Sequence, residues 1–285
     1  FDCEHYAHVL FVAHREEILT QARDTYRRIR PKAHLGLFTG QEKDRQADVL
    51  FASIQTLARK THLETFPKDH FDYIVVDEFH HAVAKTYRRL LAHFEPKFLL
   101  GLTATPERSD GQDLLALCLE NHVYRCDVLE GIRRGELCPF HYFGVPDEVD
   151  YAQIPWRNGR FDPTALELAV ATQARAQNAL EQWRRYAGPG SRTLAFCVST
   201  RHADYMRAYF LERGVKAAAV HSKESSDSRA ASLEALEASR LEVVFCVDMF
   251  NEGVDLPSVD SILMLRPTES RVLWLQQVGR GLRKQ

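Results

Sequence analysis

Asp77 and Glu78 are adjacent carboxylates that directly follow an apolar run, Tyr73–Val76. Near-continuous apolar runs predict strands buried on both faces, which are typical of parallel sheets. Open parallel sheets bind ligands at the carboxyl ends of their strands, so the pair would lie at a ligand-binding edge. There Asp77 could hold the water shell of a Mg²⁺ ion, while Glu78 could orient and deprotonate an attacking water. Taken alone, the pair fits a solvated strand end equally well.

Two hydroxyl groups lie at the end of the next predicted strand, Phe98–Thr103, and just after it. Thr103 and Thr105 could donate hydrogen bonds to the carboxylates of the neighbouring strand. A turn of this kind usually serves only as a helix N-cap. His80 follows Glu78 closely, and a histidine in such a place more often packs against its surroundings than binds a ligand.

Arg280 and Arg283 form a basic group within a predicted helix over Arg271–Arg283. Because they are three positions apart, we expect them to share one face of that helix. Two guanidinium groups at one point could neutralise the charge on a transferring phosphoryl group. A basic helix end that interacts with its own dipole is the alternative. Gly279 and Gly281, which flank Arg280, disfavour a plain surface helix, because glycine lowers helix stability.

Gly253 and Asp255 belong to the segment Asn251–Pro257, which follows the predicted strand Leu241–Val247. Glycine lets the backbone approach a ligand closely. A nearby carboxylate could bind ribose hydroxyls or an ordered water. Each of these four groups is a weak signal alone, but their order along the chain is a stronger one.

Two blocks of alternating strands and helices must position these groups. In the first block we predict strands at 8–13, 48–52, 71–77 and 98–103 and a helix at 15–29. In the second we predict strands at 193–198, 215–221, 241–247 and 259–265 and helices at 201–213, 226–238 and 271–283. Between them we predict a short helix and an irregular strand over 132–146 and one long helix over 163–186. The pattern predicts an α/β protein with two parallel-sheet domains, 1–130 and 191–285, joined by a connecting segment, 131–190.

Composition agrees with a globular protein of about two domains, since the chain has 285 residues, of which 45% are hydrophobic. The net charge of −2 gives no general basic signal for nucleic acid, but a basic groove would be enough to hold one strand. We interpret the cluster of Arg27, Arg28, Arg30 and Lys32 as a solvated helix end.

The six cysteines include no CxxC pair, and the chain has no long apolar run and no signal peptide. We therefore expect a reduced cytoplasmic protein without a zinc site or a membrane partner.

Seven segments, taken in order, resemble the motifs of superfamily 2 nucleic-acid helicases. They are VAHREEILTQA (12–22), ASIQTL (52–57), VVDEFHHA (75–82), LTATPER (102–108), FCVSTRHAD (196–204), FCVDMFNEGVDLP (245–257) and QQVGRGLR (276–283), which resemble motifs Ia, Ib, II, III, IV, V and VI. The resemblance covers nearly the whole chain and implies two RecA-like domains that couple ATP hydrolysis to movement along a strand.

The resemblance also implies cofactors and residue roles. ATP and Mg²⁺ are the implied cofactors, with the ion held by Asp77 through water. The implied catalytic residues are Asp77, Glu78, Arg280 and Arg283. The residues implied to bind the nucleotide, or to couple its site to the strand, are His80, Thr103, Thr105, Gly253, Asp255 and Gln276. The residues implied to contact the strand are His14, Arg15, Gln55, Ser199 and Thr200. Such contacts go mainly to phosphates and carry little sequence information.

Several motifs are similar to those of DNA-acting members rather than to those of DEAD-box RNA helicases. These are TATPER, NEGVDLP, LRPTES and QQVGRGLR. The branch of type III restriction, UvrB-like and repair helicases is the nearer match, so the expected partner is DNA, as a single strand or a duplex end. Proteins of this branch often carry a nuclease-like domain, which leaves room for a fused or partner domain outside this chain.

The phosphate-binding loop of the family, GxxxxGK[ST], is absent from the 285 residues. That loop supplies the backbone amides and the lysine that hold the β- and γ-phosphates. We therefore expect the first domain to be truncated at its N-terminus, the second at its C-terminus, and the chain as given to be inactive. One alternative is a fragment or a binding module that holds nucleic acid without hydrolysing ATP. Another is a non-helicase α/β enzyme, such as a nucleotide transferase.

Overall fold

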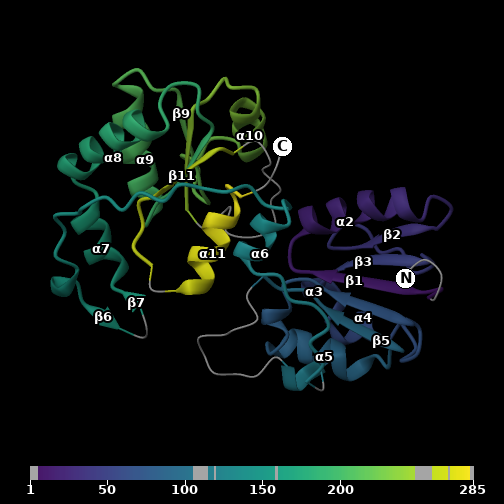
Figure 1. The fold of residues 1–285 in the computed structure, drawn as a ribbon. Helices are drawn as coiled ribbons and strands as arrows, with labels where there is room; N and C mark the ends of the chain where they lie inside the picture. Colours follow the sequence, from purple (N-terminus) through teal and green to yellow (C-terminus); the bar gives the residue numbers. More distant parts are fainter. Residues whose placement is uncertain are drawn as a thin grey trace. The chain divides into compact units, whose positions relative to one another are not determined.

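A computed structural model describes residues 6–104, 115–118, 120–157, 160–247, 259–268 and 270–282. The chain folds into two compact units, Phe1–Arg125 and Cys126–Gln285 (Figure 1). The three-part division at residues 130 and 190 stays a prediction. Thr105, Gly253, Asp255 and Arg283, which were predicted as site residues, lie outside the described residues.

The first unit contains a five-stranded parallel sheet in the order β2-β3-β1-β4-β5. Its strands are β1 (Val9–Ala13), β2 (Leu35–Phe38), β3 (Val49–Ser53), β4 (Tyr73–Val76) and β5 (Phe98–Gly101). β1 lies at the centre, where Val9 pairs with Val49 on one side and Tyr73 on the other. The predicted parallel sheet is confirmed. β2 was not predicted.

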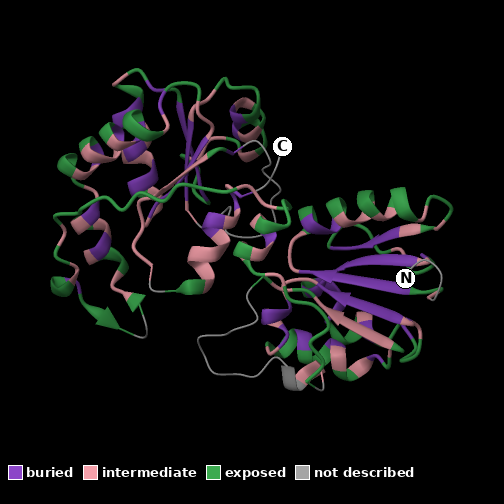
Figure 2. Ribbon diagram, viewed as in Figure 1, coloured by how far each residue is buried: buried purple, intermediate pink, exposed green. Residues whose placement is uncertain are grey.

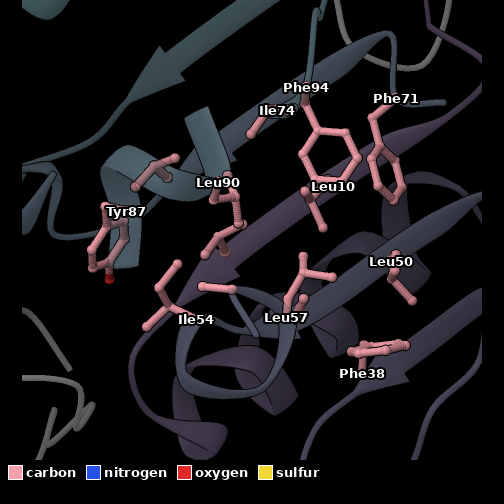
Figure 3. Close-up of a cluster of buried hydrophobic side chains, with 14 of the residues drawn as sticks. Leu10, Phe38, Leu50, Ile54, Leu57, Phe71, Ile74, Tyr87, Leu90 and Phe94 are labelled. Carbon is pink, nitrogen blue, oxygen red and sulfur yellow. The ribbon is translucent and has the colours of Figure 1, made fainter. Parts of the chain in front are cut away.

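Helices cover both faces of this sheet (Figure 1). On one face α2 (Glu16–Ile29) packs Ile18 and Leu19 against alternate residues of the strands. On the other face lie α3 (Ile54–Leu57), α4 (Lys60–Leu63) and α5 (Lys85–His93). Figure 3 shows the core on that face, with Leu10 of β1 among the side chains of α3 and α5. Burial on both faces explains why these strands are apolar almost throughout, as Figure 2 shows.

The second unit contains a four-stranded parallel sheet in the order β11-β8-β10-β9. Its strands are β8 (Thr193–Phe196), β9 (Ala217–Val220), β10 (Val243–Cys246) and β11 (Ser261–Met264). α8 (Gln173–Tyr186) and α9 (Thr200–Leu211) cover one face, and α10 (Arg229–Glu237) covers the other (Figure 1). The unit is thus a second open α/β layer structure, as the sequence predicts.

The predicted single helix over 163–186 is wrong, because the structure divides it into α7 (Pro163–Val170) and α8. The Thr172 hydroxyl accepts a hydrogen bond from the Arg175 amide and so caps a new helix. α7 begins similarly, at an N-cap Asp162 followed by proline. The sequence is rich in alanine on both sides of the break, so its periodicity predicts one continuous helix.

The remaining elements are short. They are α6 (Val128–Arg133), the antiparallel pair β6 (Trp156–Arg157) and β7 (Arg160–Phe161), and the 3₁₀ turns η1 (Phe79–His81), η2 (Leu115–Cys118) and η3 (Tyr151–Gln153). β6 and β7 lie between the stretches 132–146 and 163–186, where no strand was predicted. In the described part of the chain, no helix is both long and apolar enough to cross a lipid bilayer.

The last helix, α11, runs from Arg271 to Gly279 and ends before Arg280. The prediction that this helix continues through Arg283 is therefore wrong at its C-terminal end. Arg280 forms the C-cap, and the chain turns at Arg280 and Gly281. Two nearby glycines explain the early end, since glycine favours non-helical backbone.

Candidate functional site

The carboxyl ends of neighbouring strands in the first unit bring most of its predicted site residues to one edge of the sheet. Strand order places β3, β1, β4 and β5 side by side. The residues that follow them, in the same order, are Gln55, then His14 and Arg15, then Asp77 and Glu78, then Thr103. The residues predicted to contact a nucleic-acid strand therefore lie next to the candidate catalytic carboxylates.

Glu78 has an unusual backbone conformation, with φ 48° and ψ 52°. This left-handed conformation costs a residue with a Cβ atom about 1–2 kcal/mol. The amide of the next residue, Phe79, donates a hydrogen bond to the Leu102 carbonyl at 2.8 Å, which fixes the turn against the end of β5. Strained backbone of this kind is common at functional sites. The turn keeps the Glu78 side chain only 17% exposed.

His80 connects Glu78 with Thr103. Its Nδ1 atom lies 3.3 Å from the Glu78 Oε2 atom and 3.1 Å from the Thr103 hydroxyl. The His80 side chain is 10% exposed, so little water competes for these contacts. An N–H at Nδ1 can donate to either oxygen, and a bare Nδ1 can accept from the hydroxyl. One imidazole can therefore respond to both side chains.

Asp77 and Glu78 suit a hydrated magnesium ion. The Asp77 amide donates to the Val12 carbonyl at 2.9 Å, which holds the residue at the junction of β4 and β1. Carboxylate oxygens are hard ligands, and Mg²⁺ keeps several of its waters in most protein sites. Among the described residues, no group of three or more His, Cys, Asp or Glu side chains could enclose a metal.

The residues of the first unit that are predicted to contact a nucleic-acid strand form hydrogen bonds with one another. The Gln55 side-chain amide donates to the His14 carbonyl at 2.9 Å, and the Arg15 Nε donates to the His14 ring at 3.2 Å. The Ser53 hydroxyl donates to the Gln55 carbonyl oxygen at 2.9 Å. The His81 ring lies edge-on to His14, with centroids 5.5 Å apart. Ser53 and His81 were not predicted as site residues, although both lie inside motif-like segments.

Ser199 and Thr200 follow β8 in the second unit. The Ser199 hydroxyl accepts a hydrogen bond from the His202 amide at 3.0 Å and so caps α9. His202 is only 1% exposed, and its Nδ1 atom accepts from the Val198 amide at 3.4 Å. Burial, assisted by the nearby charge of Arg175, lowers the pKa of His202 to about 4. A neutral histidine therefore supports the turn that presents Ser199 and Thr200.

A second polar network lies at the end of β9. His221 Nε2 is 3.2 Å from Asp204 Oδ1, and the Ser225 hydroxyl donates to Asp204 Oδ2 at 2.9 Å. Burial raises the pKa of Asp204, but the hydrogen bonds from His221 and Ser225 outweigh it and the pKa is lowered overall. The network ties the loop after β9 to α9, the helix that begins at Thr200.

Two polar side chains at the C-terminal end of α11 are buried, namely Gln277 and the C-cap residue Arg280. Gln277 is 1% exposed and Arg280 is 8% exposed. Within the described part of the chain, the Gln277 Oε1 atom has no hydrogen-bond partner. The predicted site residue is Gln276, which is half-buried. The more deeply buried Gln277 was not predicted. The predicted role of Arg280 in neutralising the charge of a phosphoryl group stays a prediction.

A groove of about 1290 Å³ in the second unit contains none of the predicted site residues. The extended segment 138–147, α8 and β11 line it. On its wall Arg175 pairs with Asp147 at 2.8 Å and lies 3.4 Å from the Tyr151 hydroxyl. Burial and the hydrogen bond to Asp147 raise the pKa of Tyr151 to about 12. Because Arg175 is already paired and none of the predicted site residues lines the groove, it is a weaker candidate site than the sheet edges.

Two family profiles match the chain. Residues 2–108 match the type III restriction enzyme res subunit, and residues 176–285 match the helicase conserved C-terminal domain. These two segments together contain all the predicted site residues.

Individual relatives agree with these profiles. IRC3 of Saccharomyces cerevisiae, which carries the name of an ATP-dependent helicase, is 31% identical over 96% of this chain and 41% of its own length. The DNA 3'-5' translocase XPB2 of Sulfurisphaera tokodaii is 24% identical over 75% of this chain and 56% of its own length. A fragment assigned as an HsdR subunit of a type I restriction enzyme from Vibrio vulnificus has a TM-score of 0.71, with 25% identity over 98% of this chain and 50% of that chain.

The first three curated relatives are longer proteins, of which the chain spans 41%, 57% and 46%. The matches nevertheless extend across both parallel-sheet units and include the segments that hold the site residues. The chain belongs to helicase superfamily 2, in the branch of type III restriction and repair helicases, and its two units are RecA-like domains.

Proposed function

We propose that the protein is an ATP-dependent helicase or translocase that acts on DNA. The contact of His80 with both Glu78 and Thr103 carries the proposal, because it joins the candidate water-activating carboxylate to the neighbouring strand end. Family membership supports ATP hydrolysis, and the name of XPB2, a DNA 3'-5' translocase, supports DNA over RNA.

In the proposed mechanism, Asp77 would hold Mg²⁺ through water and Glu78 would take a proton from the attacking water. A bound Mg²⁺ would supply charge stabilisation to the phosphates. Glu78 lies in a left-handed turn, and its carboxylate is 3.3 Å from the His80 ring. When Glu78 gains a proton, it loses its charge, and its 3.3 Å contact with His80 must change. His80 would then shift its interaction toward Thr103, which gives a route from hydrolysis to the neighbouring loop.

The remaining nucleotide contacts are proposals that rest on the family. Arg280 and Arg283 would neutralise charge on the phosphoryl group, and Gln276 would hold the nucleotide or its water network. From the segment after β10, Gly253 would allow close backbone approach and Asp255 would face the ribose. Thr105 would act with Thr103. The first unit's strand contacts would be His14, Arg15 and Gln55, and the second unit's would be Ser199 and Thr200.

The decisive experiment replaces Glu78 by Gln in the full-length protein. The amide keeps the size of the side chain but cannot accept a proton, so DNA-stimulated ATP hydrolysis should fall by about 10²–10⁴-fold. Binding of nucleotide and DNA should be retained, as measured by fluorescence anisotropy. Glu237→Gln, an exposed carboxylate of α10, is the matched control and should keep normal turnover. Retained turnover in Glu78→Gln would refute the assignment.

A second function is favoured by the missing phosphate-loop motif in these 285 residues. The chain as printed would then bind DNA without hydrolysing ATP, and turnover would require the full-length protein. A normal ATPase rate from residues 1–285 alone would exclude this binding-module interpretation. We also propose that the full-length protein works in the cytoplasm, with a nuclease-like domain or partner as a candidate addition.

A further inference from the structure

A group of exposed cations covers the outer side of α5 in the first unit. Lys85, Arg88 and Arg89 are exposed, and their spacing places them along one side of the helix. The opposite side is buried, because Tyr87 and Leu90 belong to the core. The helix sequence, KTYRRLLAH, contains no acidic residue, so no carboxylate on α5 balances these charges.

A hydrogen bond joins this cationic side to α3. Arg89 Nη1 donates to the Ala58 carbonyl at 3.1 Å, at the C-cap of α3. The next residue, Arg59, is also exposed. Figure 3 shows the buried side of the same junction, where Tyr87 and Leu90 lie near Ile54 and Leu57. We call Arg59, Lys85, Arg88 and Arg89 the basic strip.

None of the four basic-strip residues forms an ion pair with any residue in the described part of the chain. Neighbouring exposed cations differ. Lys60 pairs with Glu64 at 3.7 Å, and Lys97 pairs with Asp72 at 2.7 Å. Four like charges at one junction repel each other when nothing balances them. A bound polyanion would remove that repulsion.

The basic strip is continuous with the candidate strand contacts. Gln55 lies on α3, three positions before Ala58, and its side chain reaches the His14 carbonyl at the sheet edge. A strand that crosses this edge at Gln55 would therefore meet Arg89 and Arg59 about one helical turn farther on. Resting on the proposed function, we propose that the basic strip binds the phosphates of the DNA strand beyond the sheet edge.

The surroundings of the basic strip favour nucleic acid over an anionic membrane. A membrane-binding surface places large apolar side chains beside its cations so that they enter the lipid. Among the described residues from α3 to α5, no large hydrophobic side chain is exposed. Guanidinium groups instead match phosphate oxygens through paired N–H donors.

The test measures the affinity of the purified protein for fluorescent single-stranded DNA by anisotropy over a range of NaCl concentrations. Lys85→Ala/Arg88→Ala removes two phosphate contacts and leaves the Arg89 hydrogen bond to Ala58 intact. Each phosphate contact adds about 0.7 to the magnitude of the negative slope of log K against log salt. Removing two contacts should therefore reduce that magnitude by about 1.4. Affinity at 0.1 M salt should then weaken by about 25-fold.

Two control variants complete the design. Arg27→Ala/Arg28→Ala removes two exposed cations near the C-terminal end of α2 and should leave affinity and slope unchanged. Lys85→Arg/Arg88→Lys keeps both charges and should keep most of the affinity, which separates charge from an effect on folding.

The outcomes distinguish this inference from the proposed function. Lys85→Ala/Arg88→Ala with the affinity and slope of the unaltered protein would overturn the basic strip alone. Failure of the unaltered protein to bind DNA at all would overturn both the strip and the proposed function. Loss of binding to anionic phospholipid vesicles, with DNA binding unchanged, would assign the strip to membranes and also overturn the inference.

Discussion

Burial of His202 should make the stability of the second unit depend on pH. The pKa of His202 is lowered from 6.5 to about 4, first by burial and then by the charge of Arg175. In the unfolded chain this imidazole gains a proton as the pH falls through 6.5, whereas in the folded unit it stays neutral until about pH 4. The unfolded state therefore binds more protons within this window, and the free energy of unfolding falls as the pH decreases.

The size of the effect follows from the shift. A difference of 2.5 pKa units, from 6.5 to about 4, corresponds to about 3 kcal/mol when the window has been crossed completely. At pH 5 the unfolded histidine is almost fully charged and the folded one largely neutral, so about 2 kcal/mol of this should already be lost. The lowered pKa of Asp204 affects stability only below its ordinary value of 3.8, outside this window.

Urea unfolding at pH 7.5 and pH 5 measures this loss, with tryptophan fluorescence as the signal. His202→Asn removes the titrating group but keeps an oxygen that can accept from the Val198 amide, so this variant should lose about 2 kcal/mol less than the unaltered protein between the two pH values. His141→Asn, at an exposed position of the same unit, is the control and should behave like the unaltered protein. Equal pH dependence of the unaltered protein and His202→Asn would refute the reasoning.

Two further substitutions test the packing that supports the sites. Trp183→Phe removes the buried 2.9 Å hydrogen bond from the indole Nε1 to the Thr193 hydroxyl and leaves a space in the core, so the free energy of unfolding should fall by about 2 kcal/mol, measured with urea by circular dichroism. An unchanged urea midpoint would contradict this packing. Gly101→Ala would place a methyl group 2.4 Å from the Phe79 ring and should cost about 1–3 kcal/mol and lower the melting temperature, whereas an unchanged melting temperature would contradict the close approach.

The sequence predicted those elements whose local pattern agrees with their final environment. β1, β4 and β10 are apolar almost throughout because both faces are buried, so their positions follow from composition alone. β2 was missed because its sequence, LGLF, is short and contains glycine, which is rare inside strands. The break at Thr172 was missed because its cap depends on one side-chain hydrogen bond rather than on periodicity.

The candidate site was predictable where it depends on strand ends. Asp77 and Thr103 follow apolar strands, so sheet topology alone brings them to one edge. The orientation of Glu78 toward His80 was not predictable, because it depends on a left-handed turn at a residue that is not glycine. The burial of Gln277 likewise depends on how α11 packs, which one-dimensional spacing does not encode.

The left-handed backbone at Glu78 lowers the stability of the fold at the same position that supplies a candidate catalytic carboxylate. Glycine accepts a φ of 48° without the steric cost that a Cβ atom incurs, so the most relaxed chain would carry no carboxylate there. Keeping glutamate means that the fold tolerates local strain in order to hold a proton acceptor beside His80. Selection for heat resistance alone would therefore favour glycine at position 78, and it would remove the carboxylate that the proposed function requires.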